Sequence, residues 1–139
     1  MRFMIIIKDD PKTEGQMPPP GVFEAMGNYN QSLVDAGILL AAEGLSGSKD
    51  GAIVSYAKGR HTVKDGPFAE AKELIAGFWI IQVRSKDEAV EWAKRIPLGD
   101  GGAVEVRRVA EISDFEGVMP PEVIAQEEAM RDGLARKAK

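Results

Sequence analysis

Residues 62–81 read TVKDGPFAEAKELIAGFWII, and this stretch decides how the rest of the chain folds. An Asp-Gly-Pro turn signal stands at 65–67, because Asp can bond its own backbone, Gly tolerates φ > 0 and Pro fixes φ at about −65°. The residues that follow are good helix formers and predict two helical turns over 68–75, with Pro67 at the first helical position. The apolar, β-prone run at 78–83 then predicts a buried strand.

Apolar patterns before this stretch predict further strands and a helix. The uninterrupted apolar run at 3–7 indicates a strand that is covered on both faces. Apolar residues spaced i, i+4, i+7 and i+11 predict a helix over 21–36, which Gly37 ends. A strand is predicted at 38–42, followed by a hairpin with strands at 52–57 and 61–64.

A second helix follows the central stretch. Ser85 and Glu88 form a capping box, in which each side chain accepts a hydrogen bond from the other residue's backbone. Apolar residues at i, i+3, i+4 and i+7, from Ala89 to Ile96, give this helix one buried face centred on Trp92. Glu91 and Arg95 are spaced to form a favourable i, i+4 pair.

The predicted order is strand, helix, strand, hairpin, strand, helix, strand. It describes an α+β protein with a ferredoxin-like βαββαβ domain over 1–112 and an inserted β-hairpin. A C-terminal extension, 113–139, carries a helix predicted over 122–137, with acidic residues early and basic residues late. Helices on one face of the sheet leave the other face to be covered, and a second subunit is the simplest cover, so we expect a homodimer.

The string DGPFAEAKE, followed by a glycine and an aromatic strand, resembles the signature of the YCII-related, or DGPF-domain, family over most of 1–112. This resemblance implies a dimeric α+β barrel but no defined reaction, because the family is largely uncharacterised. Shorter relatives carry a histidine on the first helix that is proposed to pair with an aspartate. Residues 21–36 contain no histidine, so this chain departs from that arrangement. Relatives are often encoded beside alternative sigma factors, which implies a regulatory role as an alternative.

Composition narrows the classes of function. The chain has 139 residues, 44% of them hydrophobic and 29% charged, and a formal net charge of −4. These values are typical of one soluble globular domain, and they argue against nucleic acid as the main partner, because phosphate binding needs a basic patch. Cysteine is absent, which excludes disulfides and thiolate chemistry and fits a cytoplasmic protein. No apolar stretch approaches the roughly 20 residues of a membrane helix.

Four polar residues are candidates for a site. Asp65 can act as a general base facing a sheet cavity, or it can simply order its turn. Glu105 and Arg107 share one face of the alternating strand 103–109, opposite Val104 and Val106. They either bind an anionic or carbonyl-bearing ligand or form a structural pair. Lys72 can join them or lie on a solvated face.

The sequence carries no sign of a metal site or a cofactor. His61 is the only histidine and has no catalytic or metal-binding partners at defined spacing. The glycine-rich segment 99–102 lacks the Lys-Ser or Lys-Thr pair of a phosphate loop and precedes a strand rather than a helix. Two hypotheses therefore remain: a homodimeric enzyme or binder of an unidentified small molecule with a polar cavity, and a regulatory or protein-interaction module without catalysis.

Overall fold

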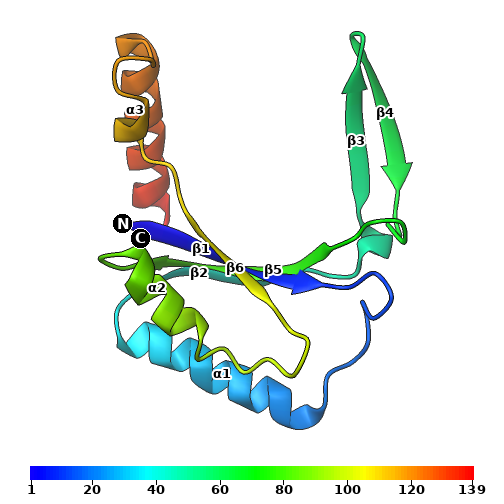
Figure 1. The fold of residues 1–139 in the computed structure, drawn as a ribbon. Coiled ribbons are helices and arrows are strands. Elements are labelled where there is room, and N and C mark those ends of the chain that lie inside the picture. The colour runs from blue at the N-terminus through cyan, green and yellow to red at the C-terminus, as the bar shows by residue number, and fades with distance from the viewer. The chain divides into compact units, whose positions relative to one another are not determined.

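The computed structural model describes all residues, 1–139, in two compact units, 1–109 and 110–139. The first unit (Figure 1) contains, in order, β1 (Arg2–Asp9), α1 (Pro20–Asp35), β2 (Leu39–Gly44), the short 3-10 helix η1 (Ser48–Asp50), β3 (Ala52–Ala57), β4 (Arg60–Asp65), β5 (Leu74–Gln82), α2 (Lys86–Ala93) and β6 (Val104–Arg108). The second unit contains η2 (Ile112–Phe115) and the C-terminal helix α3 (Pro121–Lys137). None of the helices is long and apolar enough to span a bilayer.

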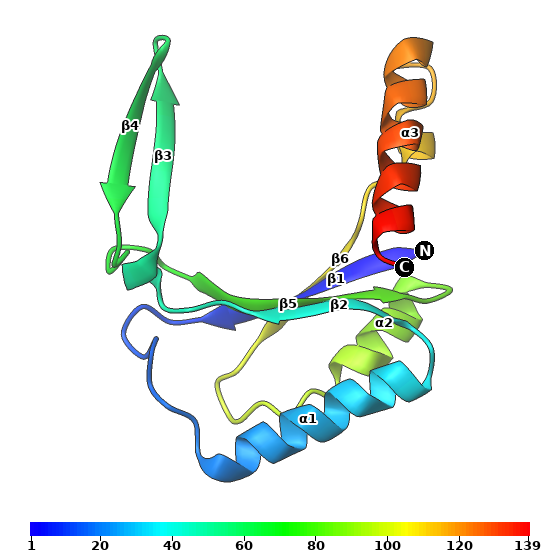
Figure 2. The ribbon, with the colours of Figure 1, turned by 180° about the vertical axis from the view of Figure 1, so that it is seen from behind.

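The sheet topology confirms the predicted ferredoxin-like fold. Four strands form one antiparallel sheet in the order β2-β5-β1-β6, while β3 and β4 pair only with each other as the inserted hairpin. Helices α1 and α2 lie on one face of the four-stranded sheet, as both views show (Figure 1 and Figure 2). The sheet stays open, so this single chain does not close a barrel.

The core lies between the sheet and the two helices. Alternate residues of a strand point to the same face of the sheet. The face towards the helices therefore carries Phe3 and Ile5 of β1 and Ile81 of β5, which are buried in one cluster with Leu33 of α1. Tyr29 on α1 packs edge-on against Trp79 on β5, with ring centroids 5.6 Å apart.

Both aromatic residues also have polar partners. The Tyr29 hydroxyl donates to the Trp92 carbonyl oxygen at 2.9 Å, and the Trp79 indole N–H donates to Asn30 Oδ1 at 2.8 Å. Buried polar groups cost free energy unless they are hydrogen-bonded. These bonds therefore fix how α1 lies on the sheet and on α2.

The predicted N-terminal cap and buried face of α2 are confirmed in part. Ser85 Oγ accepts from the backbone N–H of Glu88 at 3.1 Å, whereas the Glu88 carboxylate accepts from the N–H of Arg84 rather than Ser85. Ala89, Ala93 and Ile96 are buried as expected, but Trp92 is only partly buried, with the Arg95 guanidinium 4.3 Å from its ring centre. Glu91 forms an ion pair with Lys94 at 2.7 Å, and Arg95 adds a smaller attraction that also lowers the pKa of Glu91, so the predicted i, i+4 interaction is present beside a stronger i, i+3 pair.

The helix predicted over 68–75 is also wrong. Residues 66–73 form turns and bends, and β5 begins at Leu74, four residues before the predicted strand. Leu74 and Ile75 pair with Asp9 and Lys8 of β1 across an irregularity in the ladder. A helix of two turns is costly to nucleate, and pairing with β1 outweighs the helix propensity of the segment. The Gly66–Pro67 peptide bond is cis.

The face of the sheet opposite the helices carries an apolar centre. Met4 of β1 lies opposite Ile80 of β5, and Ile6 lies opposite Phe78. Residues directly opposite on neighbouring strands share a face, so these four side chains form one patch, which we call the open face. Of the four, Ile6 is buried and the others are half-buried.

Tyr29 provides a test of this packing. Burial raises the pKa of its hydroxyl from 10.0 to about 12. The phenol is neutral when protonated, so its contribution to stability is complete below about pH 10 and is lost as pH rises through about 12. We expect Tyr29→Phe to lower the free energy of unfolding by about 1 kcal/mol at neutral pH, through the lost hydrogen bond. The variant should also flatten the decline in stability between pH 10 and 12.

Urea unfolding over this pH range measures both effects. Tyr56→Phe is the matched control, because Tyr56 is 76% exposed, and we expect it to keep the alkaline decline of the unmodified chain. An equally steep decline in Tyr29→Phe would show that another group causes it.

Candidate functional site

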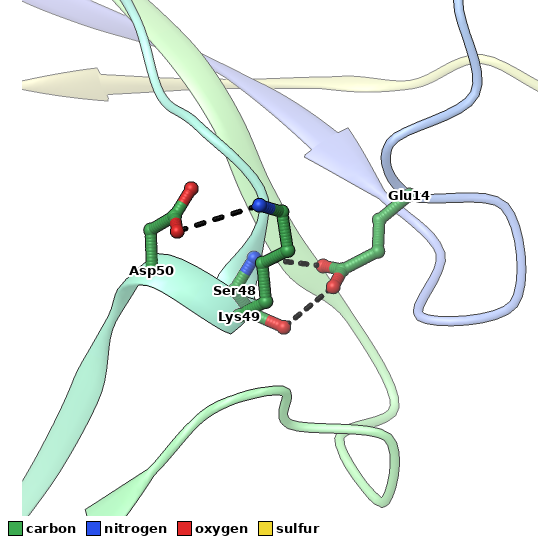
Figure 3. Close-up of polar contacts among 4 residues, drawn as sticks. All are labelled: Glu14, Ser48, Lys49 and Asp50. Carbon is green, nitrogen blue, oxygen red and sulfur yellow. Dashed lines mark hydrogen bonds and ion pairs between the residues drawn. The ribbon is translucent and has the colours of Figure 1, made fainter.

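The Asp-Gly-Pro-Phe turn is held against η1 by backbone groups. The Gly66 N–H donates to the Gly51 carbonyl oxygen at 2.9 Å, and the Phe68 N–H donates to Ser48 Oγ at 3.0 Å. The Ser48 hydroxyl in turn donates to Glu14 Oε1 at 2.6 Å, as drawn in Figure 3. Ser48 therefore connects three segments that are far apart in the sequence: the loop after β1, η1 and the turn before β5.

Gly66 is required by this close approach. A Cβ atom on Gly66 would lie 1.6 Å from the Ser48 carbonyl oxygen, a distance that no side chain can occupy. Its φ is not among the positive values, which are found at other glycines such as Gly59. The sequence analysis explained Gly66 by its tolerance of a positive φ, and this explanation is wrong. Glycine is needed at position 66 because a side chain would overlap the Ser48 carbonyl.

A large pocket opens beside this turn, and we call it the DGPF pocket. It has a volume of about 980 Å³ and lies between the loop after β1, the start of α1, the β2–η1 segment, the base of β3 and the start of β5. Its apolar wall includes Met17, Phe23, Leu45, Ile53, Phe68 and Ile75. Phe68, the last residue of the Asp-Gly-Pro-Phe turn, thus joins the anchored turn to the pocket wall.

The charged residues that line the pocket are all acidic: Asp9, Glu14, Asp50 and Glu73. Two of them have lysine partners that are not among the lining residues, since Lys49 lies 3.5 Å from Asp50 and Lys8 lies 3.4 Å from Glu73. Asp9 and Glu14 accept hydrogen bonds from Asp10 and Ser48 but have no cationic partner. Two carboxylates at the pocket therefore remain without a compensating charge.

Lys8 ties the pocket to the last strand. Its ammonium group lies 3.3 Å from Glu105 as well as 3.4 Å from Glu73. The hydrogen bond to Glu105 is the largest cause that raises the pKa of Lys8 above its usual range. Glu105 therefore already has an ion-pair partner, and Lys8 carries its positive charge at neutral pH.

The four residues predicted for the site do not come together at one place; only Glu105 and Arg107 share a surface. Asp65 is exposed at the end of β4, where it pairs with Ala52, and it is not among the residues that line the pocket. Lys72 is exposed in the turn before β5. Glu105 lies opposite Ile6, and Arg107 lies opposite Met4, so both stand on the open face, as the alternation of β6 predicts. No hydrogen bond or ion pair joins Asp65 to Arg107.

Sequence reasoning missed Glu14 and Ser48. Glu14 lies in an irregular loop next to Gly15, and Ser48 lies in a glycine- and serine-containing loop, so neither follows a helix or strand period. Their meeting depends on a contact between positions 34 residues apart. The structure contains no group of three or more His, Asp or Glu side chains arranged to hold a metal ion.

Comparison with known proteins identifies the family. A sequence model of the YCII-related domain matches residues 1–113, which include the DGPF turn, the pocket and all four strands of the sheet. The chain belongs to the YCII-related family. It is also similar to an uncharacterized protein, R00369, of Rhizobium meliloti (strain 1021), with 33% identity over 91 residues that cover 64% of this chain and 73% of that protein. YCII-related membership thus agrees with the resemblance seen in the sequence.

The close approach of Gly66 to Ser48 gives a direct test. We expect Gly66→Ala to lower the free energy of unfolding by about 1–3 kcal/mol, because the new methyl group forces the turn away from η1. The matched control is Gly99→Ala, since a Cβ at Gly99 meets no atom within 4 Å. Urea unfolding of both variants measures the difference. Equal stability of the two would show that the turn does not pack on Ser48.

Proposed function

We propose that this YCII-related protein binds a small molecule in the DGPF pocket. The observation that carries the proposal is the pocket itself, about 980 Å³ in volume and built directly on the anchored family motif. Small-molecule sites have volumes of roughly 300–1,000 Å³ and combine apolar walls with a few polar groups. The DGPF pocket has both properties, and it lies at the upper end of this range.

The lining indicates the chemistry of the ligand. An apolar wall favours a hydrophobic body, and the uncompensated carboxylates of Asp9 and Glu14 favour a positively charged group. An anionic ligand would meet acidic side chains and no basic side chain in the lining, which is unfavourable. We therefore propose a ligand with an apolar body and an ammonium or guanidinium group. The anionic or carbonyl-bearing ligand expected near Arg107 belongs to a different surface, the open face.

We also propose that the protein is a homodimer formed through the open face. Met4, Phe78 and Ile80 are apolar side chains that α1 and α2 do not cover, and a second copy would bury them. Such a dimer would enclose Glu105 and Arg107 between its two sheets, where the polar cavity predicted from the sequence would lie. The roles of Asp65 and Lys72 and the cytoplasmic location remain predictions.

Titration with simple probes tests the ligand chemistry. We expect octylammonium to shift the amide resonances of Gly15, Gly47 and Gly51, which line the pocket, more strongly than octanoate does at equal concentration. The two probes share an apolar chain and differ in charge. An equal or stronger response to octanoate would overturn the proposed charge, and no response to either would count against the pocket as a site.

Variants assign the charge preference to named residues. Asp9→Asn with Glu14→Gln should remove the preference for octylammonium while keeping side chains of the same size. Asp87→Asn with Asp100→Asn removes two charges outside the pocket and should leave the preference unchanged. Asp65→Asn tests the sequence prediction separately, and weakened binding in that variant would place Asp65 at the site.

The homodimer has its own measurement. Light scattering at micromolar concentration should give a mass of twice the 15.1 kDa chain. We expect Phe78→Ser, which removes an aromatic ring from the open face, to shift the protein towards the monomer. A stable monomer of the unmodified chain would contradict the dimer and leave the ligand proposal standing.

A further inference from the structure

The β3–β4 hairpin lacks the support that a two-stranded structure needs. All twelve residues of its strands are exposed, and the main contacts of each strand are with the other. An isolated two-stranded hairpin is at best marginally stable in water, and it needs a third strand or a packing surface for independent stability. The rest of the first unit therefore leaves both strands of the hairpin exposed.

One face of the hairpin is suited to packing. Val54 lies opposite Val63, and Tyr56 lies opposite His61, so these four side chains share a face. The rings of Tyr56 and His61 meet edge to face with centroids 4.8 Å apart. Tyr56 is 76% exposed and Val63 is 65% exposed. We call this surface the arm face.

The opposite face of the hairpin is mainly polar. Four of its six strand residues are polar, Ser55, Arg60, Thr62 and Lys64, and they alternate along the strands with the residues of the arm face. The other two, Ile53 and Ala57, lie at opposite ends of β3, and Ile53 belongs to the wall of the DGPF pocket. The hairpin is thus amphipathic, and only its arm face presents a contiguous apolar and aromatic surface. Exposed surfaces of this kind mark sites of interaction.

We propose that the hairpin is a dimer arm whose arm face packs on a second copy of this chain. The proposal rests on the homodimer formed through the open face. Within the first unit, the hairpin extends from the side of the sheet opposite α1 and α2, which is the side of the open face (Figure 1 and Figure 2). A second copy stacked on the open face would therefore stand beside the arm.

The length of the hairpin fits this partner. Strands of six residues span about 20 Å, whereas two stacked sheets lie about 10 Å apart. An arm from one copy would therefore extend past the interface and reach along the sheet of the other. In a two-fold symmetric dimer each copy supplies one arm and receives one.

Charge also favours a second copy. The segment 52–65 carries Lys58, Arg60 and Lys64 against Asp65, a net charge of +2, while the whole chain has −4. The remainder of each chain therefore has a net charge of −6. These basic side chains lie at the tip (Lys58) and on the face opposite the arm face (Arg60 and Lys64), and Lys64 is paired with Glu70 at 3.0 Å. The positive charge of the arm therefore attracts the acidic body of a second copy over a distance, and the arm face supplies the apolar contact itself.

The test compares two faces of the same hairpin. Tyr56→Ala with Val63→Ala truncates the arm face, and Ser55→Ala with Thr62→Ala truncates the opposite face as the matched control. We expect sedimentation over a dilution series to show a dimer dissociation constant at least tenfold higher for the first pair and within twofold of the unmodified chain for the second. Circular dichroism confirms that the variants are folded.

Hydrogen exchange of peptides from 52–65 gives a second measurement on the unmodified chain. Exchange should slow as the concentration rises through the dissociation constant, because the arm becomes covered. A dimer that the arm-face variant does not weaken, or an arm that exchanges equally in monomer and dimer, would overturn the arm and leave the homodimer in place. An unmodified chain that stays monomeric would overturn both, and octylammonium binding would still report on the pocket.

Discussion

The approach of Gly66 to the carbonyl of Ser48 is the constraint on which the DGPF pocket depends. The Gly66 backbone lies so close to the Ser48 carbonyl oxygen that a Cβ atom at position 66 would overlap this oxygen. Glycine is therefore the only residue that fits there. The approach is held by the Gly66 N–H on the Gly51 carbonyl and by the Phe68 N–H on Ser48 Oγ. These are ordinary hydrogen bonds, each with a net stabilisation of about 1 kcal/mol, but together they place Phe68 at the pocket.

Glu14 extends this constraint to the loop after β1. Its carboxylate accepts from the Ser48 hydroxyl and lies 3.4 Å from the Ser48 backbone nitrogen, so the loop follows the position of η1. The same carboxylate lines the pocket. A single side chain thus serves both the architecture and the electrostatics of the site, and the ligand chemistry proposed for the pocket depends on this dual position.

The fold was predictable because its signals are local and periodic. The alternation in β6, the Ser85 cap of α2 and the apolar runs of β1 and β5 each reflect burial on one or two faces, and their order determines the ferredoxin-like topology. The helix predicted over 68–75 does not form because Leu74 and Ile75 at its end pair with β1, a contact that helix propensity does not include. The pocket was not predictable, since it forms where irregular loops around Glu14 and Ser48 meet. Asp65 attracted attention as part of a motif, yet the motif residues that reach the pocket wall are Phe68, Ala71 and Glu73.

The hydrogen bond from the Gly66 N–H to the Gly51 carbonyl, 2.9 Å long, also means that the chain enters and leaves the hairpin at neighbouring points. A segment whose two ends meet can change in length at its far end while its ends stay in place, and the entropy of closing a longer loop rises only slowly with length. Strand pairs added or removed at the Lys58–Gly59 tip would leave Gly51, Gly66 and the pocket in register. The length of the hairpin is thus independent of the geometry at its base, where Gly51 and Gly66 meet.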